Sequence, residues 1–265
     1  MKIIQSFWSG QNNVIQDNRG WLSYEYHWLG WILSCNQLRK FYDNVELYTD
    51  SFGYEILIEK LNLPYTKVHV VLDEMNQYPK ELWAIAKIKT YELQNTPFLH
   101  VDGDVFIWKP FPKNLLKKSL IVQNLENSTE YYQKMWSLIS AQLNFIPKEI
   151  YNYNTEIANL GCNMGIFGGN DIDFLKKYTS KSFEFVDKNK ENWSKINSFD
   201  FNIFFEQQLF YEMSRLEKKK ISCLFTEVWG ENSYLGLVIF MMYPIKDSFC
   251  IYLEFSKEKK IYVIF

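Results

Sequence analysis

The sequence has few of the residues that define several familiar classes of protein. Its 265 residues include four cysteines, none in a Cys-x-x-Cys pair, so neither a zinc ribbon nor a disulfide framework is expected. No apolar run reaches the length that spans a bilayer, and the first ten residues lack the pattern of a signal peptide. We therefore expect a soluble cytoplasmic protein with reduced thiols, with contact at the inner face of a membrane left open.

An excess of charge of either sign is also absent. Lys and Arg total 29 against 31 Asp and Glu, and the formal net charge is -2. This balance gives no reason to expect a nucleic-acid partner. Apolar residues, at 47%, are sufficient for a sizeable core, and aromatic residues, at 18%, can also stack on the apolar faces of sugars.

Strands and helices are expected to alternate through the first hundred residues. Apolar stretches at 2–8, 45–50, 67–73 and 97–101 predict strands, and segments with helical spacing lie between them. This order is typical of an α/β fold with a mostly parallel central sheet flanked by helices. Such sheets bind ligands outside the carboxyl ends of their strands.

The second half of the sequence has weaker patterns. Residues 123–161 are polar and aromatic without a clear period, and predict a helix followed by irregular loops. Residues 163–178 predict a strand, a glycine turn and a helix, and residues 201–220 predict a helix. Short strands and turns are expected in the remainder.

Two aspartates separated by a glycine follow the fourth predicted strand, in FLHVDGDVFIWKPF at 98–111. The side chains of Asp102 and Asp104 share one side of an extended segment, where like charges repel unless a cation or hydrogen bonds balance them. Carboxylate oxygens suit Mg²⁺ or Mn²⁺, and Gly103 leaves room for a ligand. The alternative is a solvated turn, but the immediate return to an apolar segment favours a metal site.

Basic side chains near this motif are candidates for contact with a phosphate. Lys89 falls on an apolar face of the helix predicted at 79–94, where its charge needs a partner unless the side chain snorkels to solvent. Lys87 is the substitute candidate. His100 points to the same side as Asp102, and a hydrogen-bonded core histidine is the expected role, with contact to the site left open.

Two further segments offer polar groups. In GIFGG at 165–169, Gly168 and Gly169 tolerate unusual dihedrals and can bring backbone N–H groups close to a ligand, although an ordinary strand-to-helix turn is the alternative. Asn163, just upstream, could bind a hydroxyl-rich ligand.

Glu206 and Gln207 lie near the start of the last predicted helix. A carboxylate there could hold an acceptor hydroxyl or act as a base, and Asp200 is a rival for this role. The alternative is an exposed helix start, where an acid interacts favourably with the helix dipole.

Taken in order, these segments resemble the GT-A fold glycosyltransferases, and more closely an uncharacterised bacterial glycosyltransferase family with the signature HVDGDVFIWKPF. The similarity covers most of residues 1–215. It rests on KIIQSFW, LYTD, the Lys-bearing helix, HVDGDV, NMGIFGG and FEQQLF in that order. It implies one GT-A-like domain over 1–265, with a nucleotide-sugar-binding half at 1–122 and an acceptor-side half and tail at 123–265.

The resemblance implies a transferase of polysaccharide biosynthesis that depends on Mn²⁺ or Mg²⁺. Its donor would be a nucleotide sugar, expected to be a UDP-sugar, and its acceptor a glycan, lipid-linked or peptide molecule. Asp104 would bind the metal directly, while Asp102 would hold the ribose or donor sugar and assist the metal. The remaining nucleotide-side residues would be Ser6, Trp8, Ser9, Asp50, Lys89 and Gly103. The acceptor side would include Asn163, Gly165, Gly168, Gly169 and Gln207, with Glu206 or Asp200 as the base.

The sequence departs from the family pattern at one position, because no histidine follows His100 to supply a late metal ligand. Asp247 and Glu254 are the substitutes in the tail. Two other functions stay open. A haloacid-dehalogenase-type phosphatase would use Asp102 as nucleophile and Asp104 as acid, although its motif usually follows the first strand. A glycosyltransferase-like protein could also bind nucleotide or glycan without turnover.

Overall fold

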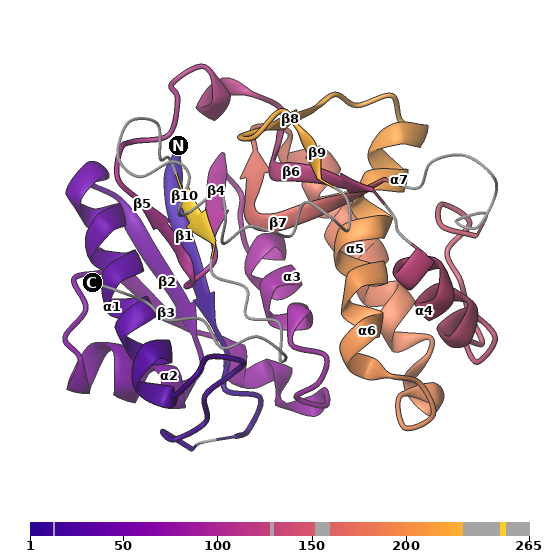
Figure 1. Ribbon diagram of the computed structural model, residues 1–265, viewed down its shortest axis with the longest axis horizontal. Coiled ribbons are helices and arrows are strands. Elements are labelled where there is room, and N and C mark those ends of the chain that lie inside the picture. Colours follow the sequence, from indigo (N-terminus) through magenta and orange to yellow (C-terminus); the bar gives the residue numbers. More distant parts are fainter. Residues whose placement is uncertain (13, 128–129, 152–159, 230–249, 253–265) are drawn as a thin grey trace.

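The computed structural model describes residues 1–12, 14–127, 130–151, 160–229 and 250–252. The described residues form one eight-stranded sheet, in which seven strands follow the order β3-β2-β1-β4-β7-β6-β8 and β9 also pairs with β6. Helices cover both faces of the sheet (Figure 1). All of its strands are parallel except β7, which runs antiparallel to both β4 and β6. The expected α/β class with a mostly parallel sheet is confirmed. The strands of this sheet are β1 (Lys2–Phe7), β2 (Val45–Thr49), β3 (Lys67–Val70), β4 (Phe98–Val101), β6 (Leu120–Asn127), β7 (Leu160–Gly169), β8 (Ile221–Cys223) and β9 (Val228–Trp229).

Helical segments connect the strands. Their bounds are α1 (Tyr24–Phe41), α2 (Ser51–Tyr54), the π-helix η1 (Glu55–Lys60), the 3₁₀-helix η2 (Leu72–Gln77), α3 (Ala84–Glu92), the 3₁₀-helix η3 (Leu115–Lys117), α4 (Glu130–Ser140), α5 (Ile172–Asp187), the 3₁₀-helix η4 (Lys190–Asn192), α6 (Ser198–Asn202), the π-helix η5 (Ile203–Gln208) and α7 (Leu209–Leu216). A small second sheet pairs β5 (Val105–Ile107) with β10 (Cys250–Tyr252).

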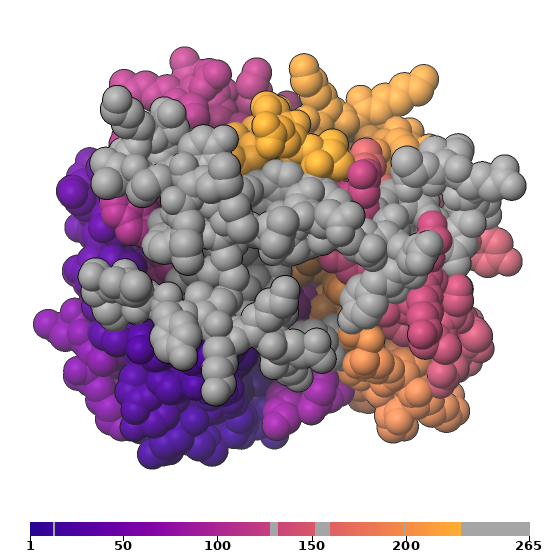
Figure 2. Space-filling model, viewed as in Figure 1, coloured from indigo at the N-terminus to yellow at the C-terminus, as the bar shows by residue number. Residues whose placement is uncertain are grey.

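The alternation of side chains along β1 divides the core between the two faces of the sheet. Ile3 is fully buried with Leu38 of α1, while Ile4 is fully buried with Ile85 of α3. Figure 2 shows the halves of the chain at the surface, with indigo and purple residues at the left and lower edge and pink to orange residues at the right. They meet where β4 pairs with β7.

The order of the strands creates a switch point beside β1. The chain moves outward from β1 through β2 to β3, then returns to place β4 on the other side of β1. Ligands of open α/β sheets bind at such a point, outside the carboxyl ends of the two strands. The segment that follows β4 is Asp102-Gly103-Asp104, so the motif lies at the edge where a ligand is expected.

Some sequence expectations were wrong. Residues 123–127 belong to β6, whereas a helix followed by loops was expected over 123–161, because buried Gln123, Asn124 and Glu126 interrupt the apolar pattern of the strand. The helix predicted at 79–94 begins only at Ala84. The substitute metal ligands of the tail, Asp247 and Glu254, lie outside the described residues.

Candidate functional site

The Asp-Gly-Asp turn is held by its backbone. The Asp102 N–H donates to the Gly165 carbonyl at 2.9 Å, and the Asp102 carbonyl accepts from Val105 N–H at 3.1 Å. Gly103 is required by close packing, because a Cβ there would lie 2.5 Å from the Trp31 ring. The turn therefore has little freedom to move.

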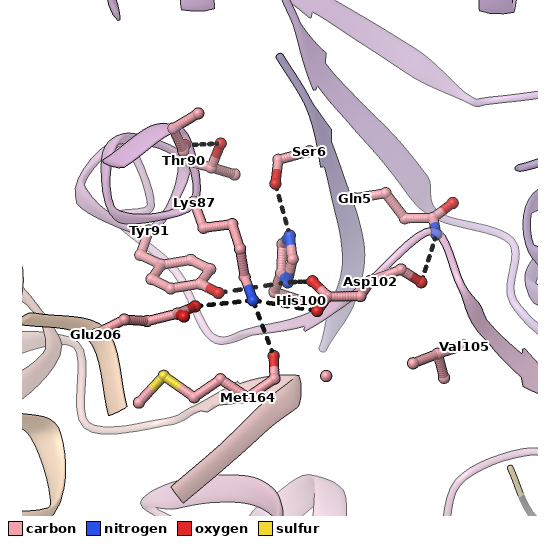
Figure 3. Close-up of polar contacts among 12 residues, drawn as sticks. Gln5, Ser6, Lys87, Thr90, Tyr91, His100, Asp102, Val105, Met164 and Glu206 are labelled. Carbon is pink, nitrogen blue, oxygen red and sulfur yellow. Dashed lines mark hydrogen bonds and ion pairs between the residues drawn. The ribbon is translucent and has the colours of Figure 1, made fainter. Parts of the chain in front are cut away.

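A buried polar network between β1 and α1 supports the same turn. Gln5 Nε2 donates to the Asp102 carbonyl at 3.3 Å (Figure 3). The same Nε2 donates to Ser34 Oγ at 3.0 Å, and Ser34 Oγ donates to the Val105 carbonyl at 2.8 Å. Tyr65 in turn donates to Gln5 Oε1 at 2.8 Å. Gln5 and Ser34 were missed in the sequence, although Gln5 in an otherwise apolar buried strand is the signal that could have identified it.

Lys87 joins two carboxylates beside the turn. Its Nζ lies 2.7 Å from Glu206 Oε1, 3.1 Å from Asp102 Oδ2 and 3.3 Å from the Met164 carbonyl (Figure 3). These residues come from α3, η5, β7 and the turn after β4. Segments far apart in the sequence thus converge on one ammonium group.

Irregular backbone brings two of these partners into place. Val122 pairs with Phe167 and Asn124 with Asn163, so Gln123 alone lies opposite three residues of β7, which include Met164. The bulge directs the Met164 carbonyl to Lys87. Glu206 lies in the π-helix η5, and π-helical turns often mark functional sites.

His100, on β4 and two residues before Asp102, is fully buried. Its Nε2 is 2.8 Å from Ser6 Oγ, and its Nδ1 is 3.5 Å from both the Tyr91 hydroxyl and Asp102 Oδ1. Burial holds the pKa of His100 well below its usual value, and Lys87 lowers it further. His100 is therefore both a hydrogen-bonded core histidine and a neutral neighbour of the site.

Burial and the unequal number of charges shift the ionisable groups of this cluster. Burial raises the pKa of Glu206 to about 6, with Lys87 opposing the shift and Asp102 adding to it. Burial likewise raises the pKa of Asp102, and Lys87 opposes it. Burial alone would lower the pKa of Lys87, but the two carboxylates outweigh it and raise the pKa above its usual value. Lys87 is thus a charged residue with two anionic partners.

The prediction for Lys89 is corrected. Lys89 is half-buried and bonds to Glu92 at 3.0 Å and Glu74 at 3.5 Å, whereas Lys87 is the buried lysine at the motif. Lys89 had been placed on a face that counted Leu82, which precedes α3, and Leu93, which is exposed.

The other residues predicted on the nucleotide side have structural partners. Asp50 is buried and accepts from the N–H groups of Ser9 at 2.6 Å and Gly53 at 2.8 Å, so it caps α2. Trp8 Nε1 donates to Asn76 Oδ1 at 2.9 Å. Of the first-strand candidates, Ser6 is the one that contacts the cluster, through His100.

The acceptor-side candidates separate into two groups. Gly165 lies beside Asp102, and Asn163 binds Gly165 N–H at 3.0 Å and Glu126 Oε1 at 2.8 Å. Gly168 and Gly169 are corrected, because they belong to β7 and lie beside the first residues of β4, at the opposite edge of the sheet. Their positive φ values and close contacts with the Phe98 and Ser119 carbonyls serve strand packing.

The residues predicted to face the acceptor near η5 also differ from one another. Glu206 is fully buried. Gln207, the predicted acceptor-side residue, is half-buried, whereas its neighbour Gln208 is buried. Asp200 shares reciprocal hydrogen bonds with Asn197 at the start of α6, a different setting from the cluster around Lys87. Glu206 is therefore the one of these three that the structure brings to the motif.

The described residues lack two features that would indicate a function directly. They contain no group of three or more His, Cys, Asp and Glu side chains arranged to hold a metal. The same part of the chain has no helix with the length and apolar character needed to cross a bilayer. Asp102 and Asp104 in the turn carry the carboxylate oxygens that could supply part of a cation's ligands.

Comparison with known proteins identifies the family without identifying an activity. A search of curated proteins found no significant match. One family model, described as "Family of unknown function (DUF6734)", matches residues 1–263. The chain belongs to this family of unknown function, DUF6734.

Proposed function

We propose that the protein is a metal-dependent glycosyltransferase of GT-A-like organisation. It would transfer a sugar from a nucleotide-sugar donor to a glycan, lipid-linked or peptide acceptor. The observation that carries the proposal is the Asp102–Asp104 turn at the carboxyl end of the central strand β4, with Lys87 and Glu206 converging on it. This edge, beside the switch point, is where α/β sheets bind ligands.

The donor set of the turn fits part of the coordination shell of Mg²⁺ or Mn²⁺. Asp102 and Asp104 offer carboxylate oxygens, which hard cations prefer, and Mg²⁺ at phosphate sites commonly has one or two carboxylates besides phosphate oxygens and water. The bound cation would neutralise the diphosphate leaving group. We assign direct coordination to Asp104 and an assisting contact to Asp102, whose Oδ2 lies 3.1 Å from Lys87 Nζ.

Glu206 receives a different role from the one its sequence position indicated. A general base must reach the acceptor hydroxyl within hydrogen-bond range. Glu206 is fully buried with its Oε1 bound to Lys87, so its contacts support a role in holding Lys87. The identity of the base, and with it the stereochemistry of transfer, stays open.

A thermal-shift panel tests the proposal. Wild type, Asp104→Asn and the control Asp43→Asn, an exposed aspartate before β2, would each be heated with UDP, GDP, CMP and their sugar conjugates, with and without Mn²⁺. A ligand at 100 times its Kd adds about 2.7 kcal/mol, which for a chain of this size raises Tm by about 5 °C or more. We expect a Mn²⁺-dependent rise with one nucleotide in wild type and Asp43→Asn, and its loss in Asp104→Asn.

Other outcomes would favour the competing functions. No shift with any nucleotide, together with hydrolysis of small phosphate esters, would overturn the proposal in favour of a haloacid-dehalogenase-type phosphatase. A shift without sugar transfer to any acceptor in a glycan, lipid and peptide panel would indicate a binding protein.

A further inference from the structure

We infer that Lys87 and a divalent cation compete for the Asp102 carboxylate, and that Glu206 retains Lys87 when the cation displaces it. The inference rests on the proposed function, because it takes the cation to bind at the Asp102–Asp104 turn. It makes Lys87 and Glu206 positioning residues that set the affinity for the cation. This role is separate from any contact with donor or acceptor.

The three oxygens around Lys87 differ in their access to solvent. An ammonium group has three N–H donors, and Lys87 Nζ has three oxygen neighbours, on Glu206, Asp102 and the Met164 backbone. The side chain of Asp102 is 23% exposed, whereas that of Glu206 is completely buried. A cation from solvent can therefore reach the Asp102 side chain but not the Glu206 side chain.

The net negative charge of the cluster favours binding of an added cation. Repulsion between that cation and Lys87 opposes their binding to Asp102 at the same time. Two carboxylates and one ammonium leave one excess negative charge, and a buried excess charge is costly. A divalent cation on Asp102 removes this excess. It would also stand next to the Lys87 ammonium, and like charges about 4 Å apart near a protein surface repel by several kcal/mol. This repulsion favours the departure of one of the two cations from Asp102.

The structure contains an acceptor for the displaced ammonium. Both carboxylate oxygens of Glu206 are buried, and neither makes a hydrogen bond to the described residues. Oε1 forms an ion pair with Lys87 Nζ at 2.7 Å, and the Met164 carbonyl accepts a hydrogen bond from the same Nζ. A shift of Nζ away from Asp102 would exchange one carboxylate oxygen for another, so Lys87 would keep three oxygen neighbours. The displacement therefore leaves no buried donor without a partner.

A set of variants separates competition from a simple effect of net charge. Lys87→Met removes the competitor, and Glu206→Gln weakens the alternative position of Lys87. The double variant Lys87→Met/Glu206→Gln removes one charge of each sign, so the cluster keeps its net charge while Asp102 loses its competitor. Lys89→Met is the matched control, since Lys89 lies two residues away and binds Glu74 and Glu92 instead.

The experiment is a Mn²⁺ titration followed by the electron paramagnetic resonance signal of free Mn²⁺, with Asp104→Asn to identify the site. We expect about tenfold tighter binding than wild type in the double variant and in Lys87→Met, about tenfold weaker binding in Glu206→Gln, and a change within about twofold in Lys89→Met. If Lys87→Met does not fold, the double variant, which buries no unpaired Glu206 charge, gives the answer.

Failure of this inference and failure of the proposed function give different results. Equal affinities in wild type and the double variant, with binding lost in Asp104→Asn, would overturn the competition and leave the cation site intact. Absence of Mn²⁺ binding at Asp104 in wild type and in the double variant, with or without UDP, would overturn both.

Discussion

Two buried charged clusters lie at opposite edges of the sheet, and α3 with the residues just after it contributes to both. At the amino edge, Glu46 Oε2 lies 3.3 Å from Lys2 Nζ, 3.0 Å from His69 Nε2 and 3.3 Å from the Tyr48 hydroxyl. Gln94, two residues beyond α3, bonds to the same hydroxyl at 3.3 Å. At the carboxyl edge, Lys87 in the first turn of α3 binds Asp102 and Glu206.

The two clusters contain similar residue types, but the pKa of the buried glutamate is lowered in one and raised in the other. Burial raises the pKa of Glu46, but His69 and Lys2 outweigh it and lower the pKa below its usual value. Burial raises the pKa of Glu206 to about 6, because one lysine cannot balance two carboxylates. The amino-edge cluster is complete without a ligand. The carboxyl-edge cluster lacks a positive charge at the edge where α/β sheets commonly bind ligands, and groups with such perturbed pKa values are candidates for functional sites.

The largest effect is expected from removing the lysine of each cluster. Lys87→Met leaves two carboxylates with no counter-ion and should lower the free energy of unfolding by about 3–5 kcal/mol. Lys2→Met leaves Glu46 with His69 and Tyr48 as partners, so the expected loss is smaller, about 1–2 kcal/mol. Urea denaturation at neutral pH measures both. A smaller loss in Lys87→Met than in Lys2→Met would show that Lys87 is not the main counter-ion of its cluster.

A smaller effect is expected in the pH dependence of Glu206→Gln. The folded pKa of Glu206 is about 6, above its ordinary value of 4.5, so its contribution to stability is present below pH 4.5 and is lost as pH rises through 6. Between about pH 4.5 and 6.5, wild type should lose about 2 kcal/mol more than Glu206→Gln. Denaturant midpoints across this range are the measurement. Parallel curves would mean that Glu206 ionises normally.

The smallest effect is expected at Glu46, with the opposite sign. Its folded pKa is below 4.5, so its contribution is present above that pH and is lost as pH falls through the folded pKa. On acidification below about pH 5, wild type should lose more stability than Glu46→Gln. Acid titration of both proteins by circular dichroism tests this. Greater acid sensitivity in the variant would contradict the balance assigned to the amino-edge cluster.

Strands β1, β2 and β4 of the first half could be predicted because burial on both faces makes them mostly apolar. The same rule failed for β6, where Gln123, Asn124 and Glu126 are buried among polar partners such as Asn163 on β7. Pairing between distant strands decided this segment, and the sequence pattern carries no record of that pairing.

The site was predictable in part. The Asp102–Asp104 motif and its position after β4 followed from the pattern, and Glu206 was a candidate without a known partner. Helical spacing could not distinguish Lys87 from Lys89, since the answer depended on where α3 begins and on the bulge that exposes the Met164 carbonyl. Contacts between elements more than 70 residues apart set these details.

The most direct test of the functional difference between the edges is calorimetric titration of UDP with Mn²⁺ into wild type, Asp102→Asn and Glu46→Gln. The account predicts binding to wild type and Glu46→Gln with similar Kd, and at least tenfold weaker binding to Asp102→Asn. Equal binding by all three proteins, or loss only in Glu46→Gln, would contradict the assignment of the functional site to the carboxyl edge.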